Sequence, residues 1–195
     1  MTLKAYLQQS SEDQPAESTV GVETDWMMLA TLKLTTGRLW IGDPQFAWAE
    51  ANEGEGCVID LPVGVYHVEA KGIDFNGSRF ASRIRVYREG SQDITFGDPF
   101  GTAETDSAQI GVADQKALKS SFDTACGDDV DAALHMLEEN IDSIVGVFEP
   151  VPGGDGRLVY VPSGLGDGGG VVLQLLSDGQ CVGIEHEFIN ANEPY

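Results

Sequence analysis

Turn signals recur at short intervals through the first hundred residues, and they limit each strand there to a few residues. Thr35-Thr36-Gly37, Pro62-Val63-Gly64 and Asp74-Phe75-Asn76-Gly77 separate apolar runs. Turns spaced by roughly 8–12 residues are typical of antiparallel sandwiches and partly open barrels. We therefore expect about six short strands in this part of the chain. The first two, residues 26–34 and 38–41, should form a hairpin.

Two Gly-Asp-Pro tripeptides, at residues 42–44 and 97–99, are predicted to end strands. A residue before proline is pushed out of the helical region, so Asp43 should be extended or turn-like. The second tripeptide should in the same way end a short strand over residues 94–96. A short strand at 57–61, the strand at 65–70 that returns from it and a strand at 80–87 complete the expected N-terminal set.

Helical patterns occur only in the second half of the chain. Asp114 can cap a helix that runs to about residue 125, and Gly127 suits the end of that helix. Asp128 or Asp129 can cap the next helix. Apolar residues with helical spacing follow, at Val130, Ala133, Leu134, Leu137 and Ile141.

Four strands, over about 144–148, 157–161, 171–176 and 180–189, should follow as a meander. The expected fold class is α+β and mainly antiparallel β, with an N-terminal sandwich-like portion, two adjacent helices and a C-terminal four-strand meander. We divide the chain into a tail (1–24), a β portion (25–103) and the helices with the meander (104–195). The two larger parts should form one compact unit.

The segment Ser163–Gly170 contains five glycines, and Asp167 is its one charged residue. Glycine-rich loops that cradle phosphate open a helix and often place a lysine nearby. Here the pattern continues into a strand, and no lysine follows Lys119. We therefore expect close backbone approach, which glycine permits, with Asp167 bonding local amides in an Asx-turn.

Ser163, Asp167 and His186 occur in the order found in one class of serine hydrolase, but no Gly-x-Ser-x-Gly elbow is present. His186 alternates with apolar residues along its strand, so it should face the core, while Glu185 and Glu187 should face solvent. The apolar residues are Val182, Ile184 and Phe188.

Aspartates at expected loops and strand ends could bind a cation, and Asp43, Asp106 and Asp167 are the main candidates, with Asp98 and Asp114 beside them. Oxygen ligands favour calcium or magnesium. No calcium-loop spacing is present, and several of these residues have turn or cap roles. We expect no cofactor, and a calcium or magnesium site is the alternative.

The formal charge of −21 comes from 32 acidic and 11 basic residues. Such a protein repels nucleic-acid backbones and anionic membrane surfaces, so an electrostatically steered partner should be a cationic protein. Solubility, or a salty habitat, is the competing explanation of the acidity. Four arginines, Arg79, Arg83, Arg85 and Arg88, should pair with acids on a neighbouring strand, and contact with a carboxylate-bearing partner is the alternative.

The three cysteines, Cys57, Cys126 and Cys181, show no Cys-x-x-Cys spacing, so neither a zinc site nor a redox motif is expected. The sequence has no basic start followed by an apolar run, and no apolar stretch approaches the ~20 residues of a membrane helix. A cytoplasmic location is the expectation.

Three segments resemble a family of uncharacterised bacterial and phage-associated proteins of unknown function. They are Leu39-Trp40-Ile41-Gly42-Asp43-Pro44, the stretch Thr105–Asp114, and Ser163-Gly164-Leu165-Gly166-Asp167-Gly168-Gly169. The resemblance covers roughly residues 26–190. This chain has Gly169-Gly170 where the family often has an aromatic residue, and Gln45-Phe46 where it often has Cys-Tyr. The family has no established activity, so the resemblance bears on the fold.

Together, the charge and the lack of a catalytic motif favour a binding or interaction module over an enzyme. We expect a basic protein partner, as an immunity-type protein would have. The alternative is a calcium- or magnesium-dependent enzyme or ligand-binding domain that uses the loop aspartates.

Overall fold

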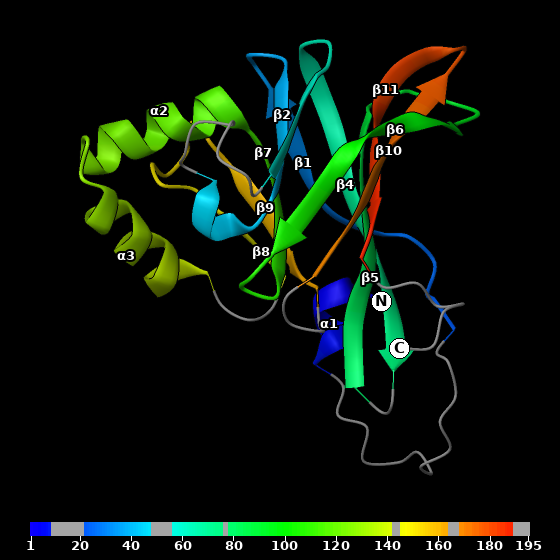
Figure 1. The fold of residues 1–195 in the computed structure, drawn as a ribbon, viewed down its shortest axis with the longest axis horizontal. Helices are drawn as coiled ribbons and strands as arrows, with labels where there is room; N and C mark the ends of the chain where they lie inside the picture. Colours follow the sequence, from blue (N-terminus) through cyan, green and yellow to red (C-terminus); the bar gives the residue numbers. More distant parts are fainter. Residues whose placement is uncertain (9–21, 48–55, 76–77, 142–144, 164–167, 189–195) are drawn as a thin grey trace.

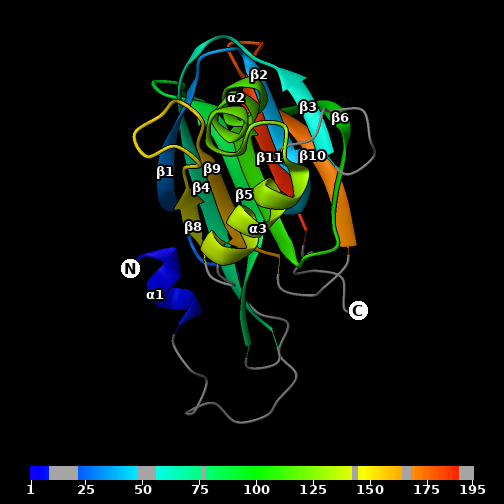
Figure 2. The same ribbon diagram turned by 90° about the vertical axis from the view of Figure 1, so that its left-hand side faces the viewer.

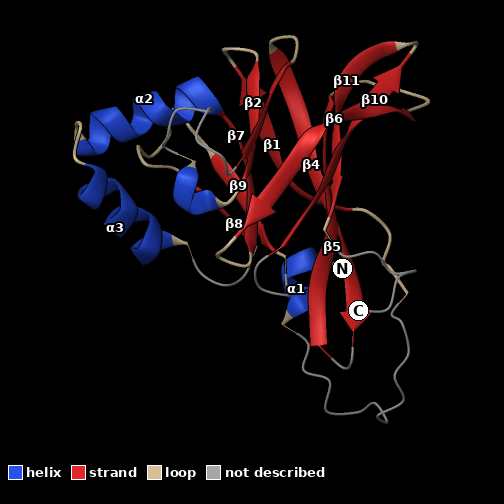
Figure 3. Ribbon diagram, viewed as in Figure 1, coloured by secondary structure: helices blue, strands red, loops and turns tan. Residues whose placement is uncertain are grey.

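The computed structural model describes residues 1–8, 22–47, 56–75, 78–141, 145–163 and 168–188. Two antiparallel sheets face each other, and the two longer helices lie beside one of them (Figures 1 and 3). The six-stranded sheet A has the order β1 (Met27–Leu34), β4 (Gly64–Phe75), β5 (Ser78–Arg88), β11 (Gln180–Glu187), β10 (Gly168–Ser177) and β6 (Thr95–Thr105). The five-stranded sheet B has the order β3 (Gly56–Asp60), β2 (Arg38–Gly42), β7 (Gln109–Asp114), β9 (Leu158–Pro162) and β8 (Gly146–Phe148). The α+β, mainly antiparallel fold class is thus confirmed.

The central strands of sheet B are buried on both faces, which explains their continuous apolar sequences. One face packs against sheet A through residues such as Ile41, Val112 and Val161. The opposite face, which includes Trp40 and Tyr160, packs against the helices. The helices are α2 (Gln115–Cys126) and α3 (Val130–Asn140), and Figure 2 shows them in front of this sheet.

Sheet A alternates between the core and an outer face that carries charge. Tyr66, Val68 and Ala70 of β4 point into the core and are fully buried. Glu69 and Lys71, which lie between and after them, point outward and take part in ion pairs. This period of two is the one expected of a strand with one covered face.

The expected hairpin between residues 26–34 and 38–41 is wrong, although both strands exist. Strand β1 pairs with β4 in sheet A, whereas β2 pairs with β3 and β7 in sheet B. The segment Thr35-Thr36-Gly37 therefore crosses between sheets. Asp114 fixes this crossing, because its carboxylate accepts hydrogen bonds from the backbone N–H and the hydroxyl of both threonines.

The second Gly-Asp-Pro does not end a strand, because β6 runs through it to Thr105. Proline is tolerated there since β6 is the edge strand of sheet A, and Pro99 lies between register shifts against β10. Asp98 is therefore an exposed strand residue and has no turn role.

The four strands after the helices do not form one meander. Strands β8 and β9 pair in sheet B, whereas β10 and β11 pair in sheet A. Both sheets therefore combine strands from the first and second halves of the chain. The short helix α1 (Leu3–Leu7) also contributes to the core, since Leu3 and Tyr6 are buried.

The predicted helix caps are confirmed. The Asp114 carboxylate accepts a hydrogen bond from the Ala117 N–H at 3.3 Å, and α2 ends at Gly127 with φ of 64°. The Asp129 carboxylate accepts one from the Ala132 N–H at 3.0 Å and starts α3. Among the described helices, none has the length and apolar character required to cross a bilayer.

Candidate functional site

Asp43 is fully buried and joins two loops at one end of sheet B. Its carboxylate accepts hydrogen bonds from the backbone N–H groups of Gln45, Asp106 and Ser107, at 2.9, 2.8 and 2.7 Å. The hydroxyls of Thr105 and Ser107 add bonds of 3.1 and 2.8 Å. The backbone of Asp43 is extended, as expected before proline, and it starts the short 3-10 helix η1 (Pro44–Phe46). Five protein donors thus use both oxygens of this carboxylate.

Two further segments contact the Asp43 segment or its neighbours, namely the turn between β6 and β7 and the residue Ser163. The turn between β6 and β7 contains Ala108 at φ of 58°, a left-handed conformation that is uncommon outside glycine. The Ala108 carbonyl accepts a hydrogen bond of 2.8 Å from the N–H of Ser163, which begins the glycine-rich segment. Segments more than fifty residues apart in sequence therefore build one junction.

The glycine-rich segment enters β10 earlier than predicted, at Gly168. Gly168 lies opposite Thr105, and Gly170 lies opposite Ala103. A Cβ on Gly170 would lie 2.1 Å from the Glu187 carbonyl oxygen, so no side chain fits there. The prediction of close backbone approach is confirmed at this position. Asp167, one of the candidate ligands, lies outside the described residues.

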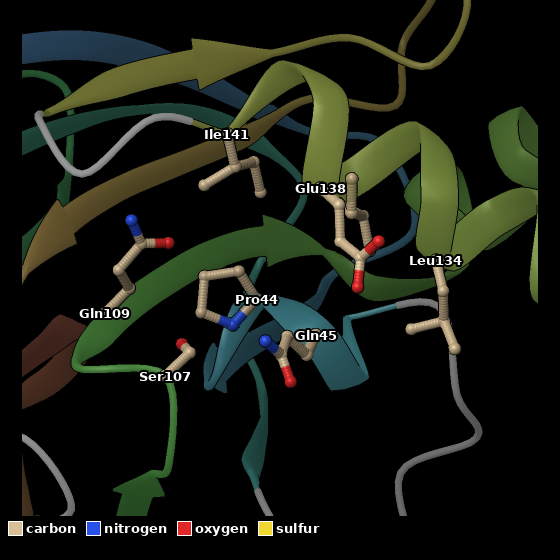
Figure 4. Close-up of a pocket in the computed structure, with 8 residues that line it drawn as sticks. Pro44, Gln45, Ser107, Gln109, Leu134, Glu138 and Ile141 are labelled. Carbon is tan, nitrogen blue, oxygen red and sulfur yellow. The ribbon is translucent and has the colours of Figure 1, made fainter.

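A pocket of about 440 Å³ opens at this junction, between η1, the β6–β7 turn and α3 (Figure 4). Its apolar lining comes from Pro44, Leu134, Leu137 and Ile141. Its polar lining comes from Gln45, Ser107, Gln109 and Glu138. Glu138 is exposed and extends from α3 toward η1. The size and the mixture of apolar floor and few polar groups are typical of ligand pockets.

The structure brings only part of the predicted aspartate set together. The backbone N–H of Asp106 bonds Asp43, while the Asp106 side chain is exposed at the turn. Asp114 lies elsewhere, at the sheet crossing described above, and Asp98 is exposed on β6. Within the described ranges, no group of three or more His, Cys, Asp or Glu side chains has the geometry of a metal site. The contacts of Asp43 identify it as a turn-forming residue.

Ser163 and His186, two members of the serine-hydrolase order, are both buried. The His186 ring faces the core as predicted, with Nδ1 3.2 Å from the Val171 carbonyl oxygen. Burial lowers the pKa of His186 to about 4, so the ring is neutral near pH 7. This environment is that of a core histidine.

Three arginines of β5, Arg79, Arg83 and Arg85, pair with acids, most of which lie on neighbouring strands, as expected. Arg83 forms ion pairs with Glu23, Glu185 and Glu187, at 3.0, 3.1 and 3.0 Å. Arg85 pairs with Glu69 at 2.5 Å. Glu185 is nevertheless only 4% exposed, so the prediction that it faces solvent is wrong. It lies beneath Arg83 on the outer face of sheet A.

The remaining contacts of the arginine group vary along β5. Arg79 pairs with Asp74 at 3.7 Å and lies over the Tyr6 ring, whereas Arg88 is exposed at the end of the strand. The Arg85 guanidinium also lies 4.1 Å from the Trp26 ring centroid, a cation–π arrangement.

The acids around Arg83 differ in pKa because their burial differs. Burial raises the pKa of Glu185 above its usual value, even though hydrogen bonding and charge from Arg83 act in the opposite direction. For Glu23 burial also acts upward, but the Ser82 hydroxyl and the Arg83 charge outweigh it and lower the pKa. The network therefore depends on Arg83, which touches both carboxylates.

Comparisons of this chain with protein-family models, with curated proteins and with solved structures found no match. The candidate site therefore rests on geometry. Sequence reasoning identified the loops that form it, through Asp43 and Asp106, but missed Glu138 and the apolar lining from α3. The helical spacing of Leu134, Leu137 and Ile141 was the one available signal.

Proposed function

We propose that this chain is a binding module for a basic protein partner, as an immunity-type protein would be. The observation that carries the proposal is the pairing of its cations. At least eight of the eleven lysines and arginines form ion pairs with its own acids. They are Lys33, Arg38, Lys71, Arg79, Arg83, Arg85, Lys119 and Arg157. Carboxylates therefore carry the surplus charge of the protein.

The excess of acidic over basic residues is clear in helix α3 and in the turn before it. Residues 128–140 contain five acids and neither lysine nor arginine. All five are exposed, namely Asp128, Asp129, Asp131, Glu138 and Glu139. On the outer face of sheet A, by contrast, Arg83 and Arg85 are matched by carboxylates. A basic partner would therefore be attracted toward the helical side of the molecule.

Charge of one sign raises the rate of encounter with an oppositely charged protein, and this effect weakens as salt screens it. A specific complex also needs close packing, which gives a defined stoichiometry and survival at about 0.15 M salt. These two properties separate a binding module from a protein that is acidic for solubility alone.

Affinity capture on the immobilised chain, followed by titration calorimetry with the purified captured protein, tests the proposal. We expect a basic protein that saturates at one copy per chain at about 0.15 M salt. Unrelated basic proteins of similar size and charge serve as controls. Non-saturable binding that is equal for all basic proteins and is lost at this salt concentration would contradict the proposal.

A further inference from the structure

The pocket at the junction of η1, the β6–β7 turn and α3 combines apolar walls with one charged side chain. Leu134 of α3 and Ile141, which directly follows α3, line the pocket together with Pro44 of η1 (Figure 4). The Glu138 carboxylate projects into the same space, and none of the eight lining residues that the structure describes is basic. A fitting occupant has an apolar stem and a cationic end.

We propose that this pocket receives an arginine side chain of the basic partner, an inference that rests on the proposed function. The three-carbon stem of arginine packs on apolar surface while its charged end remains polar. The guanidinium forms two parallel hydrogen bonds to a carboxylate such as Glu138. Arginine is also enriched at protein interfaces, and lysine is depleted there.

The other polar groups of the pocket suit a planar group with many donors. The side chains of Gln45 and Gln109 line the walls on the two sides of Pro44, and each includes a carbonyl oxygen. A guanidinium has five N–H donors, more than one carboxylate accepts, so additional acceptors around it are favourable. Its flat face can also pack against the Pro44 ring.

The position of the pocket agrees with the charge distribution. Glu138 belongs to the acidic segment of residues 128–140, and the exposed Asp106 adjoins the lining residue Ser107. An arginine of the partner that enters the pocket is therefore attracted by these carboxylates. The Asp43 carboxylate accepts hydrogen bonds from Gln45 of η1 and from Ser107 of the β6–β7 turn. These bonds hold η1 and the turn together, so the two walls of the pocket that they form are in place before binding.

The test uses Nα-acetyl-arginine N-methylamide as the probe and follows amide shifts of the full chain by NMR. The citrulline analogue is the matched control, because it keeps the shape of arginine and removes the charge. We expect saturable shifts at Ser107, Gln109 and Glu138 with a Kd on the order of 1–10 mM. Citrulline should bind at least about fivefold more weakly.

Two variants locate the charge that binds the probe. Glu138→Gln should abolish the preference for arginine over citrulline. Glu139→Gln removes the same charge from the neighbouring exposed position, which does not line the pocket, and should retain the preference. An unchanged amide spectrum in the absence of probe verifies that both variants fold.

Equal binding of arginine and citrulline, shifts that map to another face, or no saturation up to about 50 mM would overturn the inference. Equal binding of the lysine analogue would overturn the choice of arginine. If a basic protein forms a 1:1 complex but the probe does not bind, the pocket assignment fails and the proposed function stands. If the probe binds but no basic protein saturates, the proposed function fails.

Discussion

The substitution Asp43→Asn tests the structural role assigned to this buried carboxylate. Its two oxygens accept from three backbone N–H groups and two hydroxyls. An amide has one oxygen, so in either orientation its NH₂ group faces a backbone N–H of Gln45, or those of Asp106 and Ser107. At least one buried donor loses its acceptor, which costs about 1–3 kcal/mol.

In the Asp43→Asn variant, the hydrogen bonds that remain are made to a neutral amide and not to a charged carboxylate, so they are weaker. This weakening adds about 1 kcal/mol to the loss of stability. We therefore expect Asp43→Asn to lower the free energy of unfolding by about 2–4 kcal/mol. Urea denaturation followed by tryptophan fluorescence measures this change, since Trp40 is buried in the fold. Asp106→Asn is the matched control, because the Asp106 side chain is exposed, and it should cost less than about 0.5 kcal/mol.

Equal effects of the two substitutions would contradict the structural role of Asp43. So would a stabilisation of the unsubstituted protein by calcium that Asp43→Asn removes, because Asp43 would then act as a ligand and not as an acceptor for the protein's own donors.

Three further predictions follow from buried groups. Arg83→Met should lower the free energy of unfolding by about 2–3 kcal/mol in urea denaturation, because Glu185 loses its partner, whereas the exposed Arg88→Met should change it by less than about 0.5 kcal/mol. The folded-state pKa of His186 is about 4, so the unfolded chain takes up a proton between about pH 6.5 and 4 that the folded chain does not. Stability should fall by up to about 3 kcal/mol as the pH falls through that window, and His186→Gln should remove this part of the pH dependence. Gly170→Ala should lower the thermal midpoint by several degrees, because its methyl group would overlap the neighbouring backbone.

The sequence predicted well those features of the fold that depend on residues close together in the chain. Asp114 and Asp129 cap their helices because a side-chain oxygen of each accepts a hydrogen bond from a backbone N–H of the first turn, which has no partner within the helix. The inward orientation of His186 followed from alternation along one strand. In each case the determining partners are only a few residues away.

Sheet membership could not be predicted, because it depends on contacts between distant residues. The turn at Thr35-Thr36-Gly37 has hairpin chemistry, yet it crosses between sheets because Asp114, far along the chain, binds both threonines. Pro99 suggested a strand end, and only the edge position of β6 explains why the strand continues. Glu185 depends in the same way on Arg83 of the adjacent strand.

The candidate site also has one part that local sequence predicts and another part that depends on contacts between distant residues. Its loop residue Asp43 stood out in the sequence because Gly-Asp-Pro restricts the backbone locally. Glu138 did not stand out, because it is one of several acids on an amphipathic helix, and its role depends on how α3 packs against η1. A pocket formed by three separate elements has no single sequence signature.

Hydrogen exchange of the complex with the captured basic protein would locate the binding surface. We expect slowed exchange in residues 44–47, 105–109 and 130–141, which surround the pocket and carry exposed acids. Strands β4 and β5, whose outward-facing charges are already paired, should be unchanged. Slowed exchange on the outer face of sheet A, with none around the pocket, would contradict binding at the helical side.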